Sequence, residues 1–278
     1  MILVSGATGS VGKELIGLLL DKNAKVRVLV RDPKKAASWG NQVEIAVGDL
    51  DQPETLLPAM QGVEKLYFVT PDPKQVTNLL TAAQQAGVRH VVKQSTIGAG
   101  RSLGPGKWHR QQEELIKSMG FEWTFLRPTM MMVNTIEWWK ETIKLQNAVY
   151  FPGGKGKVPL VAPRDVARVA CAVLTELGHE GKIYEITGPE ALSITDMVQT
   201  IAKALNKHIQ YTDVPVLAAG ISLIRFGLPL YVINGLMHTL GALRKSEYEY
   251  VTYAVEHIGK HESQTYEQWC RENAGAFK

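Results

Sequence analysis

Cysteine is scarce in this chain of 278 residues: only Cys171 and Cys270 occur, and neither has histidines at the spacing of metal ligands. A disulfide scaffold and a structural zinc site are therefore not expected. An excess of one charge is lacking too, because the formal net charge is +4 and the basic residues are scattered along the chain. That distribution argues against nucleic acid as a partner.

Neither a leader nor an uninterrupted membrane-spanning run is expected. Residues 1–4 already have the pattern of a strand, so we expect a cytoplasmic protein in a reducing compartment. Residues 216–243 are almost entirely apolar or uncharged, with Arg225 and His238 as the exceptions. The length of this stretch would suit a membrane span. Glycines and Pro229 interrupt this stretch, which instead favours two or three short apolar helices over a pocket. No contact with a membrane is expected.

What the chain does have is a regular alternation of short apolar runs and amphipathic segments. This alternation predicts an α/β fold, namely a Rossmann-type doubly wound parallel sheet with a small C-terminal substrate-binding lobe. The predicted strands are residues 2–5, 25–30, 44–47, 65–69, 91–94, 123–126 and 182–186. The predicted helices are residues 11–20, 53–60, 72–86, 110–119, 164–177 and 193–205.

We expect one integrated domain in which two parts are interleaved. Residues 1–128 are expected to form mainly the NADP-binding Rossmann part. Residues 129–278 are expected to form mainly the substrate-binding lobe and closing elements.

A Gly-rich turn directly follows the first predicted strand. It places Gly6, Gly9 and Gly12 as G-x-x-G-x-x-G before an amphipathic helix, the context in which such glycines bind a dinucleotide. Gly6 turns the chain, Gly9 lets the backbone approach the pyrophosphate, and Gly12 lets the helix pack closely on the sheet. Free amides at the helix start then face the phosphates. The cofactor-binding residues predicted here are Gly6, Thr8, Gly9, Ser10, Val11 and Gly12.

Arg31, at the tip of the second predicted strand, indicates which dinucleotide is bound. An acidic residue there would bond the ribose 2′-hydroxyl of NAD, whereas Arg31 can pair with the 2′-phosphate of NADP. Lys35 either adds positive charge nearby or is a solvated surface lysine. NADP(H) is therefore favoured, and Asp32, directly after Arg31, leaves NAD(H) use open.

Further cofactor contacts are predicted where later strands end. Asp49 and Leu50 follow the third strand, where Asp49 either reaches the adenine edge or holds a turn. Thr70 and Pro71 follow the fourth strand and Ser95 follows the fifth, at carboxyl ends where ligands bind in parallel sheets. The sequence shows no second nucleotide motif and no metal-ligand cluster, so neither flavin nor a metal is expected.

With these residues in view, the sequence resembles the NmrA-like group of atypical short-chain dehydrogenases/reductases. The resemblance implies NAD(P)H binding and, in the reductases of the group, activity on quinones, azo dyes, triphenylmethane dyes or cyclic iminium alkaloids. The group also contains NADP-sensing regulators. The resemblance is carried by GATGSVG at 6–12, VR at 30–31, GDL at 48–50, AGVRHV at 86–91, His109 with Glu113, TFLRP at 124–128 and DVA at 165–167. It covers most of the chain and is weakest over residues 214–253.

One departure concerns the Y-x-x-x-K pair of the wider superfamily, a tyrosine that donates a proton and a lysine that lowers its pKa. Counting back from the L-R-P stretch puts Pro105 at the tyrosine position and His109 at the lysine position. His109 is left to contact the nicotinamide ribose, to donate a proton as an imidazole titrating near neutral pH, or to face water. Tyr150 is a second candidate proton donor. Glu113 is expected to orient the helix of His109 or to pair with Lys117.

The missing pair narrows the choice of hydride acceptor. Ketone reduction develops alkoxide charge, and loss of one preorganised donor costs about 10²- to 10³-fold in rate. Quinones, azo-dye tautomers, triarylmethane cations and iminium ions accept hydride directly, because the arriving charge is neutralised or delocalised. Met131, Met132, Asn134 and Trp138 follow the sixth predicted strand and suit a small planar aromatic substrate, unless they are plain core.

Two functions are therefore compared. The first is an NAD(P)H-dependent oxidoreductase of the azo or quinone reductase type, which transfers hydride to an electron-poor aromatic acceptor. The alternative is an NADP-sensing regulatory protein without turnover, which the missing pair would suit. A nucleotide-sugar epimerase is disfavoured, because those enzymes keep the tyrosine and lysine. A monomer and a homodimer are both compatible with the sequence.

Overall fold

A sheet of seven parallel strands forms the centre of the fold, in the order β3-β2-β1-β4-β5-β6-β9. The computed structural model describes residues 1–101, 104–225, 227 and 230–278. Chain order reverses between β1 and β4, the point at which such sheets bind ligands at their carboxyl edge. The predicted Rossmann-type sheet is thus confirmed. Its strands are β1 (Ile2–Ser5), β2 (Val26–Val30), β3 (Glu44–Val47), β4 (Lys65–Phe68), β5 (His90–Gln94), β6 (Glu122–Pro128) and β9 (Lys182–Ile186).

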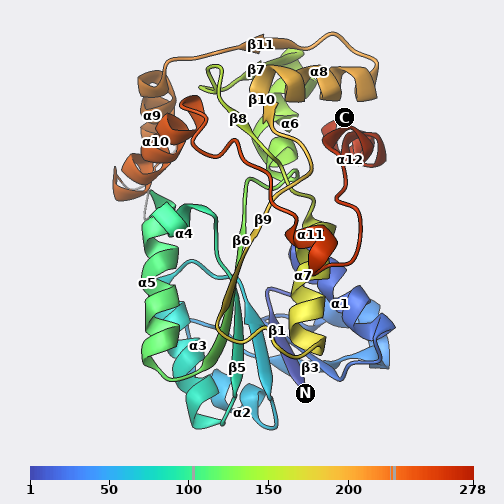
Figure 1. Cartoon of the computed structure of the whole chain (residues 1–278), viewed down its shortest axis with the longest axis vertical. Coiled ribbons are helices and arrows are strands. Elements are labelled where there is room, and N and C mark those ends of the chain that lie inside the picture. The colour runs from blue at the N-terminus through green and yellow to red at the C-terminus, as the bar shows by residue number, and fades with distance from the viewer. Residues whose placement is uncertain (102–103, 226, 228–229) are drawn as a thin grey trace.

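Helices cover both faces of this sheet (Figure 1). On one face α1 and α7 pack against each other, and residues such as Leu15 and Val169 share one apolar cluster with the sheet. On the other face α2, α3 and α5 bury residues such as Leu79 and Ile116 in a second cluster. These helices are α1 (Ser10–Asp21), α2 (Leu56–Met60), α3 (Pro73–Gln85), α5 (Pro105–Ser118) and α7 (Pro163–Thr175). Shorter elements are η1 (Pro33–Gln42), η2 (Pro53–Thr55), α4 (Gly98–Arg101) and α11 (Ala254–His257).

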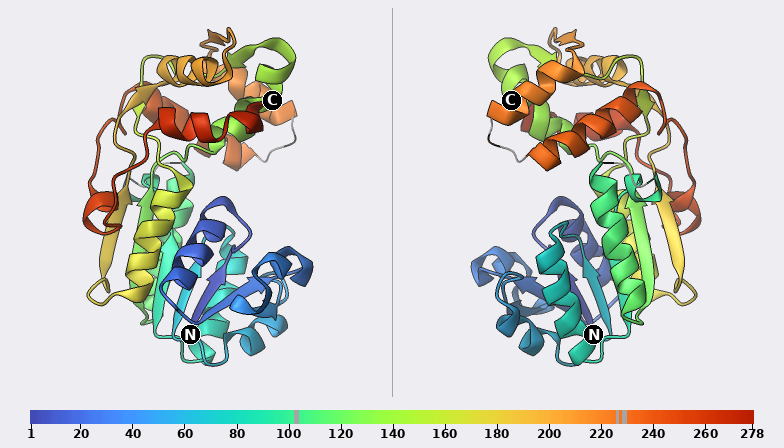
Figure 2. Two further views of the ribbon diagram at one scale, coloured as in Figure 1. Left: turned by 90° about the vertical axis from the view of Figure 1, so that its right-hand side faces the viewer. Right: turned by 90° about the vertical axis from the view of Figure 1, so that its left-hand side faces the viewer.

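A lobe with its own apolar core lies beyond the carboxyl ends of the strands (Figures 1 and 2). Trp139, Tyr266 and Trp269 are buried in that core. The helices of the lobe are α6 (Asn134–Gln146), α8 (Ile194–Leu205), α9 (Val216–Arg225), α10 (Leu230–Arg244), α12 (Tyr266–Glu272) and η3 (Ala274–Phe277). Its strands pair as β7 (Ala148–Tyr150) with β11 (Gln210–Thr212) and β8 (Lys157–Val158) with β10 (Leu192–Ser193).

The chain crosses between the two parts repeatedly after Pro128. It enters the lobe with α6, returns to the sheet with α7 and β9, and enters the lobe again with β10 and α8 (Figure 1). β9 extends the sheet beside β6, and α7 packs on α1. α7, β9 and α11, which all follow residue 128, therefore pack with the sheet rather than with the lobe.

Two segments differ in detail from their sequence-based description. α5 begins at Pro105 rather than at residue 110, which places His109 inside the helix and not at its start. In the predicted apolar stretch, residues 216–225 form α9 and residues 230–244 form α10, whereas Pro229 lies outside the described residues. Among the helices that the structure describes, none is long and apolar enough to cross a membrane.

Candidate active site

The turn between β1 and α1 has the geometry that its glycines predict. Gly6 adopts a φ of +82°, in the left-handed region that glycine tolerates. The amide of Gly9 donates a hydrogen bond to the carbonyl oxygen of Gly6 at 3.0 Å. A Cβ at Gly12 would lie 2.2 Å from that same oxygen, so a larger residue cannot pack here without moving α1. Within the described chain no side chain caps α1, which leaves its first amides available to a phosphate.

A cleft of about 260 Å³ opens at the carboxyl ends of β1, β2 and β3. It brings together six of the predicted cofactor residues, which are Gly6, Thr8, Arg31, Lys35, Asp49 and Leu50. Asp32 also lines it, but its carboxylate accepts a hydrogen bond from the amide of Lys34 at 3.0 Å and caps η1. Asp49 Oδ1 accepts from the amide of Asp51, so this residue holds a turn while lining the cleft.

Gln75 is a cleft residue that sequence reasoning missed. It lies in the first turn of α3, and its Oε1 accepts a hydrogen bond from the Thr70 hydroxyl at 2.6 Å. Thr70 itself does not line the cleft, so the structure gives it the role of orienting Gln75. No local sequence signal separates Gln75 from other glutamines near helix starts.

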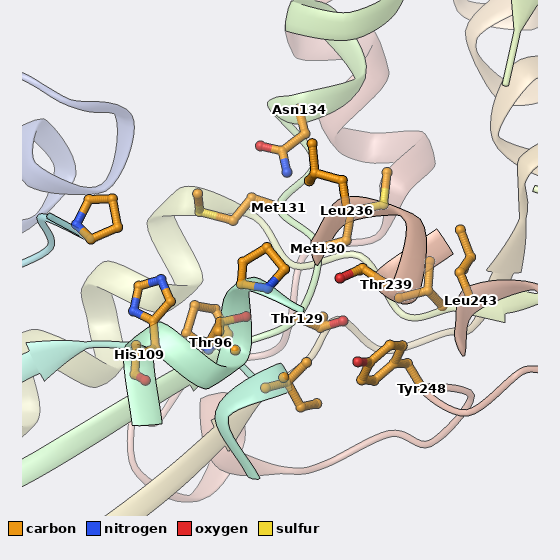
Figure 3. Close-up of a pocket in the computed structure, with 18 of the residues that line it drawn as sticks. Thr96, His109, Thr129, Met130, Met131, Asn134, Leu236, Thr239, Leu243 and Tyr248 are labelled. Atoms are coloured by element: carbon orange, nitrogen blue, oxygen red, sulfur yellow. The ribbon is translucent and has the colours of Figure 1, made fainter. Parts of the chain in front are cut away.

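A second cavity, of about 470 Å³ and here termed the main pocket, lies between the ends of β4, β5 and β6 and the lobe (Figure 3). It adjoins the cleft, because a Cβ on Gly6 would lie 2.8 Å from Val69, a residue of the main pocket. No Asp, Glu, Lys or Arg occurs among its described lining residues. These are Val69, Pro71, Gln94, Ser95, Thr96, Ile97, Gly98, Pro105, Gly106, His109, Pro128, Thr129, Met130, Met131, Asn134, Trp138, Phe151, Val158, Leu236, Thr239, Leu240, Leu243 and Tyr248.

The main pocket thus collects predicted residues from distant parts of the chain: Pro71, Ser95, His109, Met131, Asn134 and Trp138. Met132 is 0% exposed and belongs to the lobe core, because it points away from the pocket that its neighbours line. Tyr150 is 49% exposed on β7 and lines neither cavity. Gly9, Ser10, Val11 and Gly12 shape the turn without lining the cleft.

His109 lies on α5 and faces the main pocket (Figure 3). Burial first, and then the nearby charge of Lys93, together lower the pKa of its imidazole to about 3. An imidazole that titrates near neutral pH is therefore not what the structure contains. His109 Nδ1 and Thr129 Oγ1 are both buried without a hydrogen-bond partner among the described residues. Because both residues line the main pocket, these atoms are placed to bond a ligand.

The state of His109 has a direct kinetic consequence. Because its pKa lies near 3, the imidazole is uncharged throughout pH 5 to 8, so His109 itself contributes no limb to a pH-rate profile in that range. We expect wild type and His109→Gln to share every inflection between pH 5 and 8, measured as initial rates of NADPH oxidation. An inflection present in wild type and absent from His109→Gln would contradict this assignment.

An aromatic pair stands on the lobe side of the main pocket. Trp138 and Phe151 stack with ring centroids 5.6 Å apart and an interplanar angle of 14°. Trp139, a residue of the lobe core, packs edge-on against Phe151 with the two ring centroids 5.7 Å apart. Trp138 and Phe151 both line the pocket, and Trp138 remains partly exposed. This pair offers a flat apolar surface to a planar ring.

Beneath the pocket lies a buried charged network that sequence reasoning assigned differently. Both oxygens of Glu113 accept hydrogen bonds from Arg127, at 2.6 and 3.1 Å, and one also accepts from the Ser95 hydroxyl at 2.5 Å. The expected pairing of Glu113 with Lys117 is wrong, because Lys117 pairs with Glu114 instead. Glu113 faces the sheet from α5 and is 0% exposed, whereas Glu114 is on the solvent side.

Metal ligands are not gathered anywhere in the described chain. No group of three or more His, Cys, Asp or Glu side chains there could hold a metal ion. Cys171 and Cys270 are both buried and unpaired with each other.

Comparison with known proteins gives consistent matches. The description of the matching family is NAD(P)H-binding, and the match covers residues 6–177. An NAD(P)H azoreductase from Xenophilus azovorans is 34% identical over 285 residues, spanning 100% of this chain and 99% of that protein. The NADPH-dependent quinone oxidoreductase from Escherichia coli, complexed with NADPH, superimposes with a TM-score of 0.86 at 26% identity, covering 98% of this chain and 99% of that one. Citrobacter sp. triphenylmethane reductase, complexed with NADP(H), gives a TM-score of 0.83 at 27% identity over 99% and 100% of the two chains.

Proposed function

This chain belongs to the NAD(P)H-binding family, within its NmrA-like reductases, and on that premise we propose that it transfers a hydride from NADPH to an electron-poor aromatic acceptor. The acceptor classes are quinones, azo dyes, triarylmethane dyes and imines. One observation carries the proposal: an uncharged, aromatic-lined pocket of about 470 Å³ adjoins the nucleotide cleft at the carboxyl ends of the strands. Relatives of high coverage include reductases of three such acceptors, which supports the same chemistry here.

The cleft fits the cofactor through the chain's own atoms. The uncapped amides of α1 suit the pyrophosphate, and the close approach at Gly12 keeps them in place. Arg31 and Lys35 supply two exposed cations for a 2′-phosphate, so NADPH is proposed over NADH. When bound, NADPH supplies the hydride, and we propose that neither flavin nor a metal is needed.

The main pocket orients an acceptor without a strong acid. Trp138 and Phe151 stack on a planar ring and exclude water, while the flexible Met130 and Met131 adapt to rings of different outline. Thr129 offers its unpartnered hydroxyl as a hydrogen-bond donor to an acceptor oxygen or nitrogen. The pocket therefore suits acceptors that delocalise or neutralise the incoming charge, and it suits simple ketones poorly.

The direct test is loss of NADPH absorbance with purified protein, assayed with EDTA and without added flavin. The panel contains a benzoquinone, an azo dye, a triarylmethane dye, a cyclic imine and a plain ketone. We expect turnover with electron-poor acceptors and at least about 100-fold less with the ketone, because Pro105 and His109 stand where the superfamily has its proton-donating tyrosine and the lysine that activates it. Equal turnover of the ketone would contradict the proposed acceptor class.

A cofactor-sensing role without turnover is the second candidate. The observation in its favour is Pro105 and His109 at the positions of the superfamily's tyrosine and lysine. Tight NADPH binding with no oxidation in the presence of any acceptor would favour this role over the reductase.

A further inference from the structure

A lysine is buried beneath the uncharged main pocket. Lys93 is 0% exposed in the middle of the sheet, on β5. Its Nζ lies 5.0 Å from the ring centroid of Phe68 and 3.5 Å from the carbonyl oxygen of Gln94. Lys93 does not line the pocket, but the two residues that follow it, Gln94 and Ser95, both do. The ammonium is therefore one layer below the pocket wall.

Few charges compensate this ammonium. From α5, the Glu113 carboxylate acts on it, but both oxygens of Glu113 already bind Arg127 of β6. His109, also on α5, lies within the field of the ammonium and is itself neutral. From β4 it meets the ring of Phe68. The buried face of α3 is apolar, formed by Val76, Leu79, Leu80, Ala82 and Ala83.

Burial changes the pKa of Lys93, and it also leaves little water to screen the ammonium from the main pocket. Desolvation lowers the pKa of the Lys93 ammonium to about 7, while the Glu113 carboxylate opposes that shift. The charge of Lys93 also disfavours protonation of His109, a residue of the pocket wall. In a poorly solvated interior such a charge acts over several ångströms with little screening.

We propose that Lys93 is an electrostatic positioning residue for hydride transfer: its buried ammonium supplies the positive charge that the wall of the main pocket lacks. This proposal rests on the proposed function. A neutral quinone takes up a hydride, two electrons and one proton, as the donor C–H bond breaks, and becomes a monoanion that a solvent proton completes. Lys93 favours the negative charge as it develops. A triarylmethane cation becomes neutral on taking up a hydride, so the same ammonium opposes binding of that acceptor.

The charge of the acceptor therefore provides the test. We expect Lys93→Met, which keeps length and apolar volume, to lower kcat/KM for a neutral benzoquinone by at least about tenfold. The same variant will leave kcat/KM for a cationic triarylmethane dye unchanged or raise it. Lys117→Met is the matched control, because Lys117 is on the far part of α5, over the Trp123 ring at 4.9 Å, and should alter neither rate.

The pH dependence provides a second readout. As pH rises through about 7, Lys93 loses its proton, so quinone turnover falls while turnover of the cationic dye holds or rises. Lys93→Arg keeps its charge to pH 9 and removes the fall. In Lys93→Met, quinone turnover is low and does not change with pH over this range.

Melting temperature and NADPH affinity establish that each variant is folded and loaded. An equal loss with both acceptors, or no loss with either, would overturn the role of Lys93 while leaving the reductase intact. If the variants fail to fold, the wild-type profiles decide: opposite trends for the two acceptors support the role, and parallel trends refute it. Failure of wild type to reduce either acceptor would overturn the proposed function and this inference together.

Discussion

Gly12→Ala will weaken NADPH binding by about 10- to 100-fold, since losing a hydrogen bond to a charged group costs about 1.5 to 3 kcal/mol. The added Cβ would lie 2.2 Å from the Gly6 carbonyl oxygen and 2.8 Å from Ala7 Cα, both of them backbone atoms that no rotamer change can move aside. Either α1 shifts outward or the turn opens, and both displace the amides that face the pyrophosphate. Titration of NADPH fluorescence measures the change.

Gly17→Ala is the matched control for that substitution. Gly17 lies on the exposed side of the same helix, and a Cβ there would have no heavy atom within 4 Å. Alanine is a better helix former than glycine by about 1 kcal/mol, so this variant should bind NADPH normally and melt slightly higher. Normal binding by Gly12→Ala would show that the turn does not hold the pyrophosphate.

Arg31→Ala will change the choice between the two dinucleotides. Loss of a charge-assisted hydrogen bond costs about 1.5 to 3 kcal/mol, which corresponds to roughly 10- to 100-fold in NADPH affinity. NADH carries no 2′-phosphate, so its dissociation constant should change by less than about twofold in the same variant. Isothermal titration with both cofactors separates the two effects.

Lys34→Ala controls for the general loss of positive charge near the cleft. Lys34 is exposed three residues after Arg31 and does not line the cleft, whereas Lys35 does. Two results would contradict specific pairing of Arg31 with the 2′-phosphate. One is an equal loss of affinity for NADPH and NADH in Arg31→Ala, and the other is a loss of NADPH affinity in Lys34→Ala as large as that in Arg31→Ala.

The arrangement of charge explains how the pocket can work without the superfamily's tyrosine and lysine. Its wall is uncharged, with His109 held neutral, while the charges of Lys93, Glu113 and Arg127 are buried one layer below. A flat apolar acceptor can then enter without meeting an unpaired ion that must lose its water. Fixed charge at short range still acts on the reacting atoms, because little solvent lies between to screen it.

The sequence by itself determined the features that depend on neighbours along the chain. The strand, Gly-rich turn and helix at 2–21 form a continuous unit, so the sharp turn at Gly6 and the close approach at Gly12 could be predicted directly from the glycines. Arg31 and Lys35 were placed in the cleft by their positions after β2, since the carboxyl end of a parallel strand faces the ligand. Periodicity also located most strands to within a residue or two.

Tertiary structure alone decided the features that depend on packing between distant segments. Met131 and Met132 are adjacent, yet one lines the pocket and the other fills the lobe core, because neighbouring side chains point in different directions. Glu113 can bind Arg127 and Ser95 only because α5 packs across β5 and β6. Loss of water around both groups keeps His109 neutral and lowers the pKa of the Lys93 ammonium. Solvation is a property of the assembled fold, and no local pattern of residues reports it.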